Sequence, residues 1–250
     1  MVDDAIPAAT IVVVREPDDG TAPELLIVER AAGMAFAGGA LVFPGGRIDE
    51  ADRELAAELG LGDDGPERIA AIRETIEETA IPVGFASPPP PDLCLTIQTA
   101  LSRGEPFASV IEGHRLSLDP AALTPFARWV PKFHAVRRFD TLFFVARAPA
   151  GEWQPQALAG ECTGAFWLTA LEVLERDRRG EAQIIFPTRR NLERLAQHAT
   201  YGAMVADATS HDVEPISPWV EEIEGERFIT IPDNLGYPVI RERLDRLWRG

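Results

Sequence analysis

Cysteine and long apolar runs are scarce in this chain. Its two cysteines, Cys94 and Cys162, lie far apart and outside any C-x-x-C pair, which excludes a disulfide framework and a cysteine-based zinc site. No apolar run approaches the ~20 residues of a membrane-spanning helix. The first four residues, Met-Val-Asp-Asp, are acidic where a secretory signal would be basic, so we expect a cytoplasmic protein in a reducing environment, without a membrane partner.

Positive charge is also in short supply. Forty acidic residues against 24 basic ones give a formal net charge of −16, which argues against nucleic acid or an anionic membrane as a partner. Lys132 is the single lysine, and all other basic residues are arginines, whose planar fork suits phosphate groups. An acidic protein with a phosphate substrate would need a cation to reverse the local charge.

The length and composition suit one main domain. A chain of 250 residues with 46% hydrophobic and 26% charged residues is close to an average globular protein. Such a chain can bury roughly 70–75% of its unfolded surface and needs no disulfides to fold. We expect a main domain over 1–210 and an extension over 211–250 that packs on it. The extension is predicted to contain a hairpin with strands over 219–223 and 227–231.

Predicted strands and helices alternate along the chain. Two β-rich runs at 11–14 and 25–28 flank a turn signal, Pro-Asp-Asp-Gly, at 17–20. Further strands are expected over 127–130, 139–146 and 163–168. Helices are expected over 49–61, 66–81, 93–116 with a break near 104–106, 170–178 and 187–208. The alternation predicts an α/β fold with a mixed sheet between helical layers. Because no strand-Gly-x-Gly-x-x-Gly-helix unit occurs, a dinucleotide-binding fold is disfavoured.

The helix over 66–81 has the clearest signals. Asp64 and Glu67 form a capping-box pattern, and Pro66 takes the first helical position. Pro82 is expected to end the helix. An apolar stripe at i, i+3 and i+7 marks the face turned to the core: Ile69, Ile72 and Ile76.

The same helix carries three carboxylates on one side. Glu74, Glu77 and Glu78 stand at i, i+3 and i+4. Like charges so close repel one another by a few tenths of a kcal/mol per pair unless a cation sits among them. Mg²⁺ uses such carboxylates together with the phosphate oxygens of a substrate. In a chain this acidic, a triple of this kind arises by chance roughly once, so the triple alone establishes no function.

The glycine-rich segment upstream gives the triple a context. The residues at 43–52, Phe-Pro-Gly-Gly-Arg-Ile-Asp-Glu-Ala-Asp, followed by Arg-Glu-Thr-Ile-Glu-Glu at 73–78, resemble the signature of the Nudix hydrolases. That signature is G-x5-E-x7-R-E-U-x-E-E-x-G-U, where U is a bulky aliphatic residue. The resemblance places a box over 45–81. The matching positions are Gly46, Arg73, Glu74, Glu77, Glu78 and Ile81.

Three features depart from the signature. Asp52 stands in the place of the first glutamate, and Thr75 and Ala80 replace the aliphatic residue and the glycine. Twenty residues instead of seven separate Asp52 from Arg73, with an insertion at about 53–65. An interrupted box is similar to that of a Nudix branch that includes coenzyme A diphosphatases of the peroxisomal type. The runs at 26–30, 42–46 and 137–144 also resemble that branch.

The resemblance implies a fold, a reaction and a substrate class. It implies an α/β/α sandwich with a loop-helix-loop box, and a hydrolase that cleaves the pyrophosphate linkage of a nucleoside diphosphate derivative with Mg²⁺ or Mn²⁺. Coenzyme A or an acyl-coenzyme A is the preferred substrate, and ADP-ribose or a dinucleotide is the alternative. A nucleotide-binding module without turnover is a further alternative, which the departures at Asp52, Thr75 and Ala80 admit. A homodimer is a possible assembly, and the hairpin is a possible contact for it.

The resemblance also implies roles for residues of the box. Glu74, Glu77 and Glu78 would supply metal ligands and catalytic carboxylates, together with the backbone carbonyl of Gly45. A tight Gly-Gly turn lets that carbonyl approach a metal with no Cβ in the way. The structural members of the box are Gly46, Asp52 and Arg73, of which Arg73 is expected to pair with Asp52.

Residues outside the box complete the predicted site. Glu161 lies just before a predicted strand, where many Nudix enzymes carry a loop glutamate that acts as the general base; a solvated carboxylate is the alternative. Arg30, Arg137 and Arg138 are candidates to bind substrate phosphates, although a charged strand entry explains all three about equally well. Three aromatic residues could stack on an adenine or pack in the core, with the core preferred for Trp167: Phe36, Trp129 and Trp167.

Overall fold

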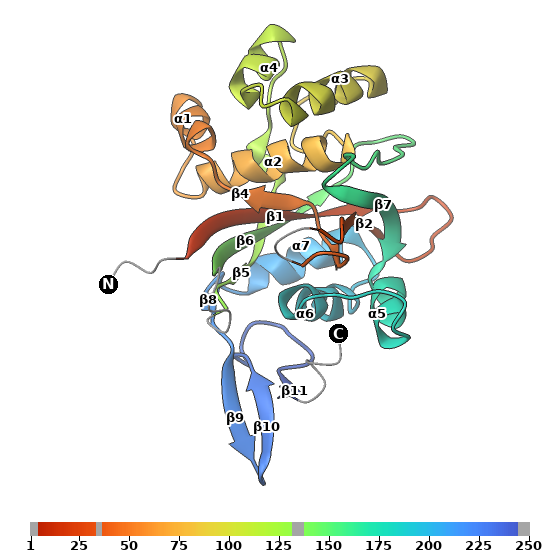
Figure 1. Ribbon diagram of the computed structural model, residues 1–250, viewed down its shortest axis with the longest axis vertical. Coiled ribbons are helices and arrows are strands. Elements are labelled where there is room, and N and C mark those ends of the chain that lie inside the picture. The colour runs from red at the N-terminus through yellow and green to blue at the C-terminus, as the bar shows by residue number, and fades with distance from the viewer. Residues whose placement is uncertain (1–4, 34–36, 132–137, 245–250) are drawn as a thin grey trace.

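A mixed β-sheet forms the centre of the molecule (Figure 1). The computed structural model describes residues 5–33, 37–131 and 138–244. The strand order is β3-β2-β1-β6-β5-β8, with β4 paired to β1 and β7 paired to β2. Strand β1 runs parallel to β6 and antiparallel to β2. The strands are β1 (Ile6–Arg15), β2 (Glu24–Arg30), β3 (Leu41–Val42), β4 (Gly45–Arg47), β5 (Thr124–Trp129), β6 (Phe139–Arg147), β7 (Cys162–Thr169) and β8 (Pro215–Ile216).

Helices cover both faces of this sheet (Figure 1). One layer contains α1 (Glu50–Glu58), α2 (Gly65–Thr79), α3 (Pro91–Ser102) and α4 (Phe107–Gly113). The other layer contains α5 (Ala170–Arg178), α6 (Phe186–Leu195) and α7 (Tyr201–Ser210). Within β1, Ile11 and Val13 face the first layer whereas Val12 and Val14 face the second. Burial on both faces explains the unbroken apolar run of β1, and the predicted α/β sandwich is confirmed.

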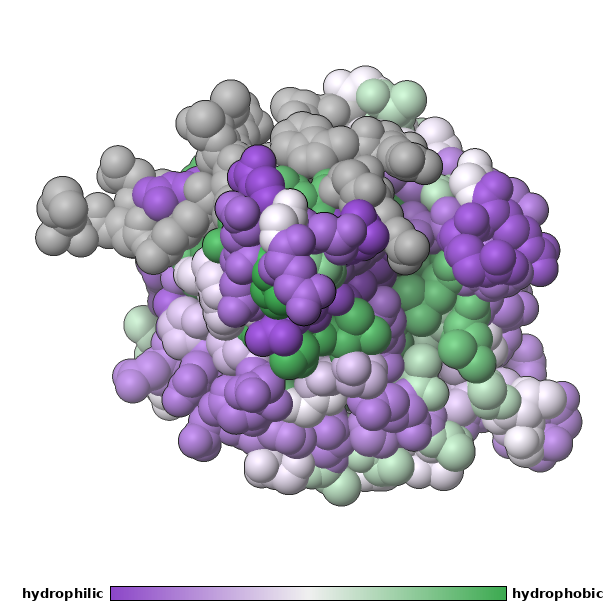
Figure 2. All heavy atoms as spheres, turned by 90° about the horizontal axis from the view of Figure 1, so that it is seen from below, coloured by the Kyte–Doolittle hydropathy of each residue, from purple (hydrophilic) through white to green (hydrophobic). Residues whose placement is uncertain are grey.

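A three-stranded sheet projects from one end of the molecule. It consists of β9 (Trp219–Ile223), β10 (Glu226–Thr230) and β11 (Arg241–Arg243), so the predicted hairpin is present. Figure 2 looks at this end and shows apolar surface among hydrophilic side chains. Residues that follow the hairpin, among them Leu235 and Tyr237, are buried in the core that α6 and α7 cover. Among the described residues, no helix is both long and apolar enough to cross a membrane.

Two predicted features of the helices are wrong. The helix expected over 187–208 is two helices, α6 and α7, and the hydroxyl of Thr200 accepts the Ala203 N–H at 3.1 Å to begin the second one. The capping box of Asp64 and Glu67 does not form. The Asp64 carboxylate instead accepts a bond from Arg68 at 2.7 Å, one turn into α2. The predicted break between α3 and α4 is confirmed.

Candidate active site

Gly45 and Gly46 begin β4, which pairs with β1 and packs on α2, so the tight turn expected at these residues is extended strand instead. A Cβ at Gly45 would clash with the backbone of Ala9 and Thr10, and a Cβ at Gly46 would clash with the carboxylate of Glu74. Only glycine permits this close approach at both positions. The Gly45 N–H donates to Glu78 at 3.1 Å. The start of β4 therefore lies directly on the carboxylate-bearing side of α2.

Arg73 ties the parts of the box together. Its Nε and Nη2 donate to the two oxygens of Asp52 at 2.9 Å each, and Asp52 is 1% exposed. Its Nη1 donates to Glu74 at 2.8 Å and lies 3.5 Å from Glu77. The predicted pairing of Arg73 with Asp52 is confirmed. Burial disfavours the charged guanidinium, but the bonds to Asp52 and the charge of Glu74 outweigh this and raise the pKa of Arg73.

The insertion in the box forms most of α1 and the connection from it to the start of α2. Asp52 lies in the first turn of α1, where it also accepts the Asp49 N–H at 2.9 Å. Its carboxylate thus serves the start of α1 and the guanidinium of Arg73 on α2. The long spacer therefore leaves the link between the two ends of the box intact, because α1 packs back on α2.

The three glutamates of α2 form a largely buried cluster of carboxyl groups. Burial raises the pKa of Glu74 to about 7, against the opposing effect of Arg73. Burial, and then the charge of Glu74, raise the pKa of Glu78 well above its usual range. Burial also raises the pKa of Glu77. Ionised carboxylates are thus unfavourable in this environment, and a cation placed among them would relieve the penalty.

The chemistry of these groups fits a hard divalent cation. Carboxylate and carbonyl oxygens are the ligands of Mg²⁺ and Mn²⁺. Glu74 and Glu78 lie beside the backbone of Gly45 and Gly46, and Arg73 links Glu77 to Glu74. In the part of the chain that the structure describes, no three His, Cys, Asp or Glu side chains could hold a metal by themselves. Mg²⁺ does not need such a cage, because it keeps waters and takes phosphate oxygens of the substrate as ligands.

Glu161 lies in the loop between β6 and β7, close to the box. Its carbonyl accepts the Ala31 N–H at 2.8 Å. Its side chain is exposed, and its charge helps to raise the pKa of both Glu77 and Glu78. The fold thus brings this loop carboxylate near Glu77 and Glu78, and its role as general base stays a prediction.

The three candidate arginines differ in what the structure shows. Arg30 ends β2 opposite Cys162, and its charge lowers the pKa of Glu78. Its Nε is buried and has no hydrogen-bond partner within the described ranges. Arg138 directly precedes β6, where its carbonyl accepts the Ile6 N–H at 2.8 Å. Arg137 lies outside the described residues, so its role stays a prediction.

Two of the three aromatic candidates pack in the core of the protein. Trp129 is buried in the core beneath α6, and its Nε1 donates to Asn191 at 3.1 Å. Trp167 packs against the core on the opposite face of the sheet, the face that α2 and α3 cover. Its Nε1 donates to the Trp153 carbonyl at 2.8 Å, and its ring lies under the guanidinium of Arg15. The preference for core packing of Trp167 is confirmed, and Trp129 is also a core residue. Phe36 lies outside the described residues.

Two residues of the site carry no sequence signal. Cys162 begins β7, and burial together with the charge of Glu78 raises the pKa of its thiol to about 12. It is therefore an unreactive thiol in the wall of the site. Gln98, on α3, is 8% exposed and donates to the carbonyl of Glu77 at 3.0 Å. Both contacts depend on how distant segments pack, which local patterns do not reveal.

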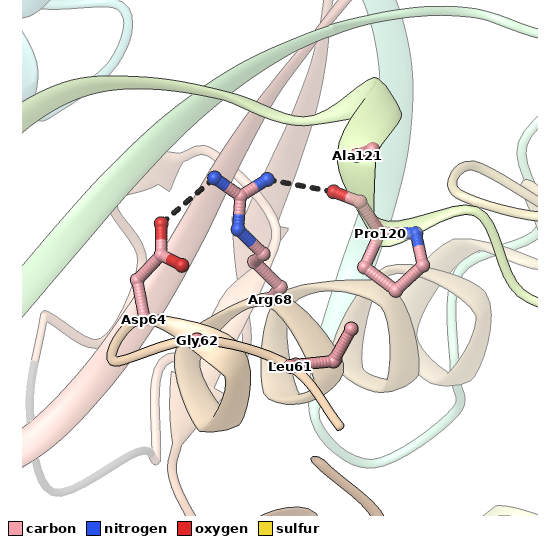
Figure 3. A pocket seen from close by; sticks show the side chains of 6 residues that line it. All are labelled: Leu61, Gly62, Asp64, Arg68, Pro120 and Ala121. Carbon is pink, nitrogen blue, oxygen red and sulfur yellow. Dashed lines mark hydrogen bonds and ion pairs between the residues drawn. The ribbon is translucent and has the colours of Figure 1, made fainter. Parts of the chain in front are cut away.

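A pocket of about 260 Å³ lies at the opposite end of α2 (Figure 3). It is lined by Leu61, Gly62, Asp64, Arg68, Pro120 and Ala121. The guanidinium of Arg68 donates to the carbonyls of Pro120 and Leu123 at 2.7 and 2.6 Å and to Asp64. Those bonds join α2 to the segment before β5, so the polar residues of this pocket hold two elements together. The pocket lies apart from the carboxylate cluster.

Comparison with known proteins supports the resemblance seen in the box. No protein-family model matches the chain. The chain is 39% identical to the uncharacterized Nudix hydrolase NudL of Cronobacter sakazakii over 75 residues, which are 30% of this chain. That match spans 31% of the relative's own length, or about a third.

The structural comparison is more extensive. A crystal structure of a NUDIX hydrolase from Alicyclobacillus acidocaldarius superposes with a TM-score of 0.70 at 28% identity, and covers 82% of this chain and 97% of that chain. The fold is that of a Nudix hydrolase. Together the two similarities support the Nudix hydrolase family that the box resembles.

Proposed function

We propose that this protein is a metal-dependent hydrolase that cleaves the pyrophosphate linkage of a nucleoside diphosphate derivative, with coenzyme A or an acyl-coenzyme A as substrate. One observation carries the proposal. The helix carboxylates Glu74 and Glu78 lie against Gly45 and Gly46 of β4, and Glu77 and Glu78 lie within electrostatic reach of Glu161. This arrangement would place a cation, held by the helix carboxylates, close to Glu161 as the candidate base.

The metal would be held by Glu74, Glu77, Glu78 and the carbonyl of Gly45. When bound, Mg²⁺ or Mn²⁺ neutralises charge on phosphate oxygens and makes a water more acidic. The protein orients these ligands beforehand: Arg73 contacts Glu74 and Glu77, and the Gly45 N–H contacts Glu78.

Glu161 would accept the proton of the attacking water. The water oxygen forms a bond to one phosphorus of the pyrophosphate, and the bond from that phosphorus to the bridging oxygen breaks. Two phosphate monoesters are the products. Arg30 would bind a phosphate through its guanidinium, whose charge already acts on Glu78 at the site. Arg137 and Arg138 are proposed to assist it.

Coenzyme A is preferred among the possible substrates because of sequence features outside the carboxylate cluster. The runs at 26–30 and 42–46 resemble the approach to the box in coenzyme A-cleaving relatives, and Arg30 lies at the site. ADP-ribose or a dinucleotide shares the same pyrophosphate chemistry. A binding module without turnover is disfavoured, because drift would be expected to remove the glutamates first.

A substrate panel in ¹⁸O-labelled water, analysed by mass spectrometry, tests the proposal. Coenzyme A, an acyl-coenzyme A, ADP-ribose, reduced nicotinamide dinucleotide and nucleoside triphosphates are incubated with Mg²⁺ or Mn²⁺. We expect coenzyme A to yield phosphopantetheine and an adenosine bisphosphate, with ¹⁸O in one of the two products. Cleavage of none of these compounds with either metal would refute the hydrolase. Tight nucleotide binding without turnover, unchanged by Glu77→Gln, would favour the binding module.

A further inference from the structure

The loop that carries Glu161 is attached to the C-terminal end of α2. The last carbonyls of an α-helix lack partners within the helix. In α2 the Glu78 carbonyl accepts the Leu158 N–H at 3.0 Å, and the Thr79 carbonyl accepts the Gln156 N–H at 2.8 Å. The loop between β6 and β7 is thus hydrogen-bonded to the C-terminal end of α2. The loop and this end of the helix lie side by side in Figure 1.

Gln98 closes the same junction from a third element. Its Nε2 donates to the carbonyl of Glu77 at 3.0 Å and to the carbonyl of Gln156 at 2.8 Å. A side-chain amide nitrogen has two hydrogens, and both are used here. One buried amide on α3 therefore joins the helix that bears the glutamates to the loop that bears Glu161.

The rest of the loop transmits this position to Glu161. The Leu158 carbonyl accepts the N–H of Cys162 at 3.0 Å, and the Glu161 carbonyl accepts the Ala31 N–H at 2.8 Å. The backbone of Glu161 is thus held between Leu158, which is bonded to α2, and the end of β2. A shift of Gln156 on one side would move this segment relative to Glu77 and Glu78.

We propose that Gln98 is a positioning residue that sets the place of Glu161 relative to the glutamates of α2. The inference rests on the proposed function, because it assigns Gln98 an effect through the base of that reaction. Misplacement of a catalytic group by about 1 Å can lower a rate about 100-fold. Loss of the amide would also leave the carbonyls of Glu77 and Gln156 buried without that donor.

Hydrogen exchange tests the structural half of the inference without any substrate or metal. The variant Gln98→Met keeps the side-chain length and apolar stem but removes the donor. We expect faster exchange at the amides of Gln156 and Leu158, with exchange in α6 unchanged. Gln197→Met is the matched control, since Gln197 Nε2 also donates to two carbonyls, those of Arg194 and Gly236, away from the box. Equal exchange at the loop amides in Gln98→Met and in the unmodified protein would refute the inference.

A double-mutant cycle tests the catalytic half. With the substrate identified by the panel, Gln98→Met is expected to lower kcat about ten-fold or more and to change KM little. In a Glu161→Gln background, Gln98→Met should change kcat less than about two-fold, because the residue acts through Glu161. An equal loss in both backgrounds would overturn the inference. So would full activity in Glu161→Gln, whereas failure of the unmodified protein to cleave any substrate refutes the hydrolase and leaves the exchange result to stand alone.

Discussion

Ala80 ends α2 in a conformation that suits glycine better than alanine. Its φ is +57°, in the left-handed region, and its N–H donates the last helical bond, to the Ile76 carbonyl at 2.9 Å. This backbone conformation releases the carbonyls of Glu77, Glu78 and Thr79 to the loop and to Gln98. Ala80 stands at the position of the glycine in the Nudix signature. The left-handed backbone at this position explains why the signature has glycine there.

We expect Ala80→Gly to be neutral or slightly stabilising, because it removes the Cβ from a left-handed position. Ala80→Val should lower the free energy of unfolding by about 1–2 kcal/mol, since a branched side chain tolerates this region poorly. Urea denaturation measures both. Ala71→Gly, in the buried interior of α2, is the control and should destabilise. A valine variant as stable as the unmodified protein would contradict the assignment.

Asp52 is the second residue whose effect can be measured directly. Asp52→Asn leaves the buried Arg73 without one charged partner and should lower the free energy of unfolding by about 2–4 kcal/mol. Glu175→Gln is the control, because the ion pairs of Glu175 with Arg178 and Arg179 lie at the surface and such pairs contribute about 0–1 kcal/mol. Equal effects of the two substitutions in urea denaturation would show that Arg73 does not depend on Asp52.

At the scale of elements, α2 carries both core and chemistry. Ile69, Ile72 and Ile76 are completely buried, while Glu74 and Glu77 remain partly open. The helix is therefore rigidly seated before any ligand binds, which keeps the carboxylates together in spite of their repulsion.

A bound cation should therefore stabilise the protein. We expect Mg²⁺ or Mn²⁺ to raise Tm at pH 8 by mass action on the folded state. The double substitution Glu74→Gln with Glu77→Gln should remove this dependence, because it removes two of the proposed ligands. Glu172→Gln, with Glu172 at the start of α5, is the control and should respond like the unmodified protein. Equal metal-induced shifts in all three proteins would exclude the site.

Helix α6 contains a buried carboxylate of a different kind. Burial raises the pKa of Glu193 to about 7, in spite of the opposing charge of Arg190 3.0 Å away. A raised pKa in the folded state means that the native protein favours the protonated acid. The corresponding stability is fully present below the usual pKa of 4.5 and is lost as the pH rises through about 7.

Glu193→Gln should accordingly flatten the pH dependence of stability. We expect the free energy of unfolding of the variant, relative to that of the unmodified protein, to increase from about pH 5 to pH 8. Urea denaturation at each pH measures it. Glu181→Gln, an exposed carboxylate after α5, should leave the profile unchanged. If the difference between Glu193→Gln and the unmodified protein were constant across this range, Glu193 would not titrate there.

At the scale of the whole molecule, the C-terminal extension packs into the core between the sheet and the layer of α5, α6 and α7. The Tyr237 hydroxyl donates to Asn191 at 2.9 Å, next to the bond from Trp129, and Glu242 pairs with Arg190 at 2.9 Å. We propose that 211–250 belongs to the same folding unit as 1–210.

Tyr237→Phe tests this attachment. The substitution removes one buried bond to Asn191 and should lower the free energy of unfolding by about 1–2 kcal/mol, with one cooperative transition retained. Tyr201→Phe, in the first turn of α7, is the comparison and should have a smaller effect because its side chain is half-buried. A separate low-stability transition that alone responds to Tyr237→Phe would mean that the extension unfolds independently.

The sequence by itself determined the features that depend on local periodicity and on short motifs. The apolar stripe of α2, the glycine pair at 45–46 and the buried run of β1 are all local features of the sequence. From them the fold class and the carboxylate cluster could be predicted. The resemblance of the box added Arg73 with Asp52, and it pointed to Glu161.

Only the tertiary structure decided the contacts between distant segments. Asp64 bonds to Arg68 and not to the start of its own helix, because that arginine is held by carbonyls of the segment before β5. The junction of Gln98 with α2 and the loop before β7 likewise has no pattern in the sequence. Such contacts depend on how elements pack across the core, where burial and the need to satisfy every backbone carbonyl outweigh local preference.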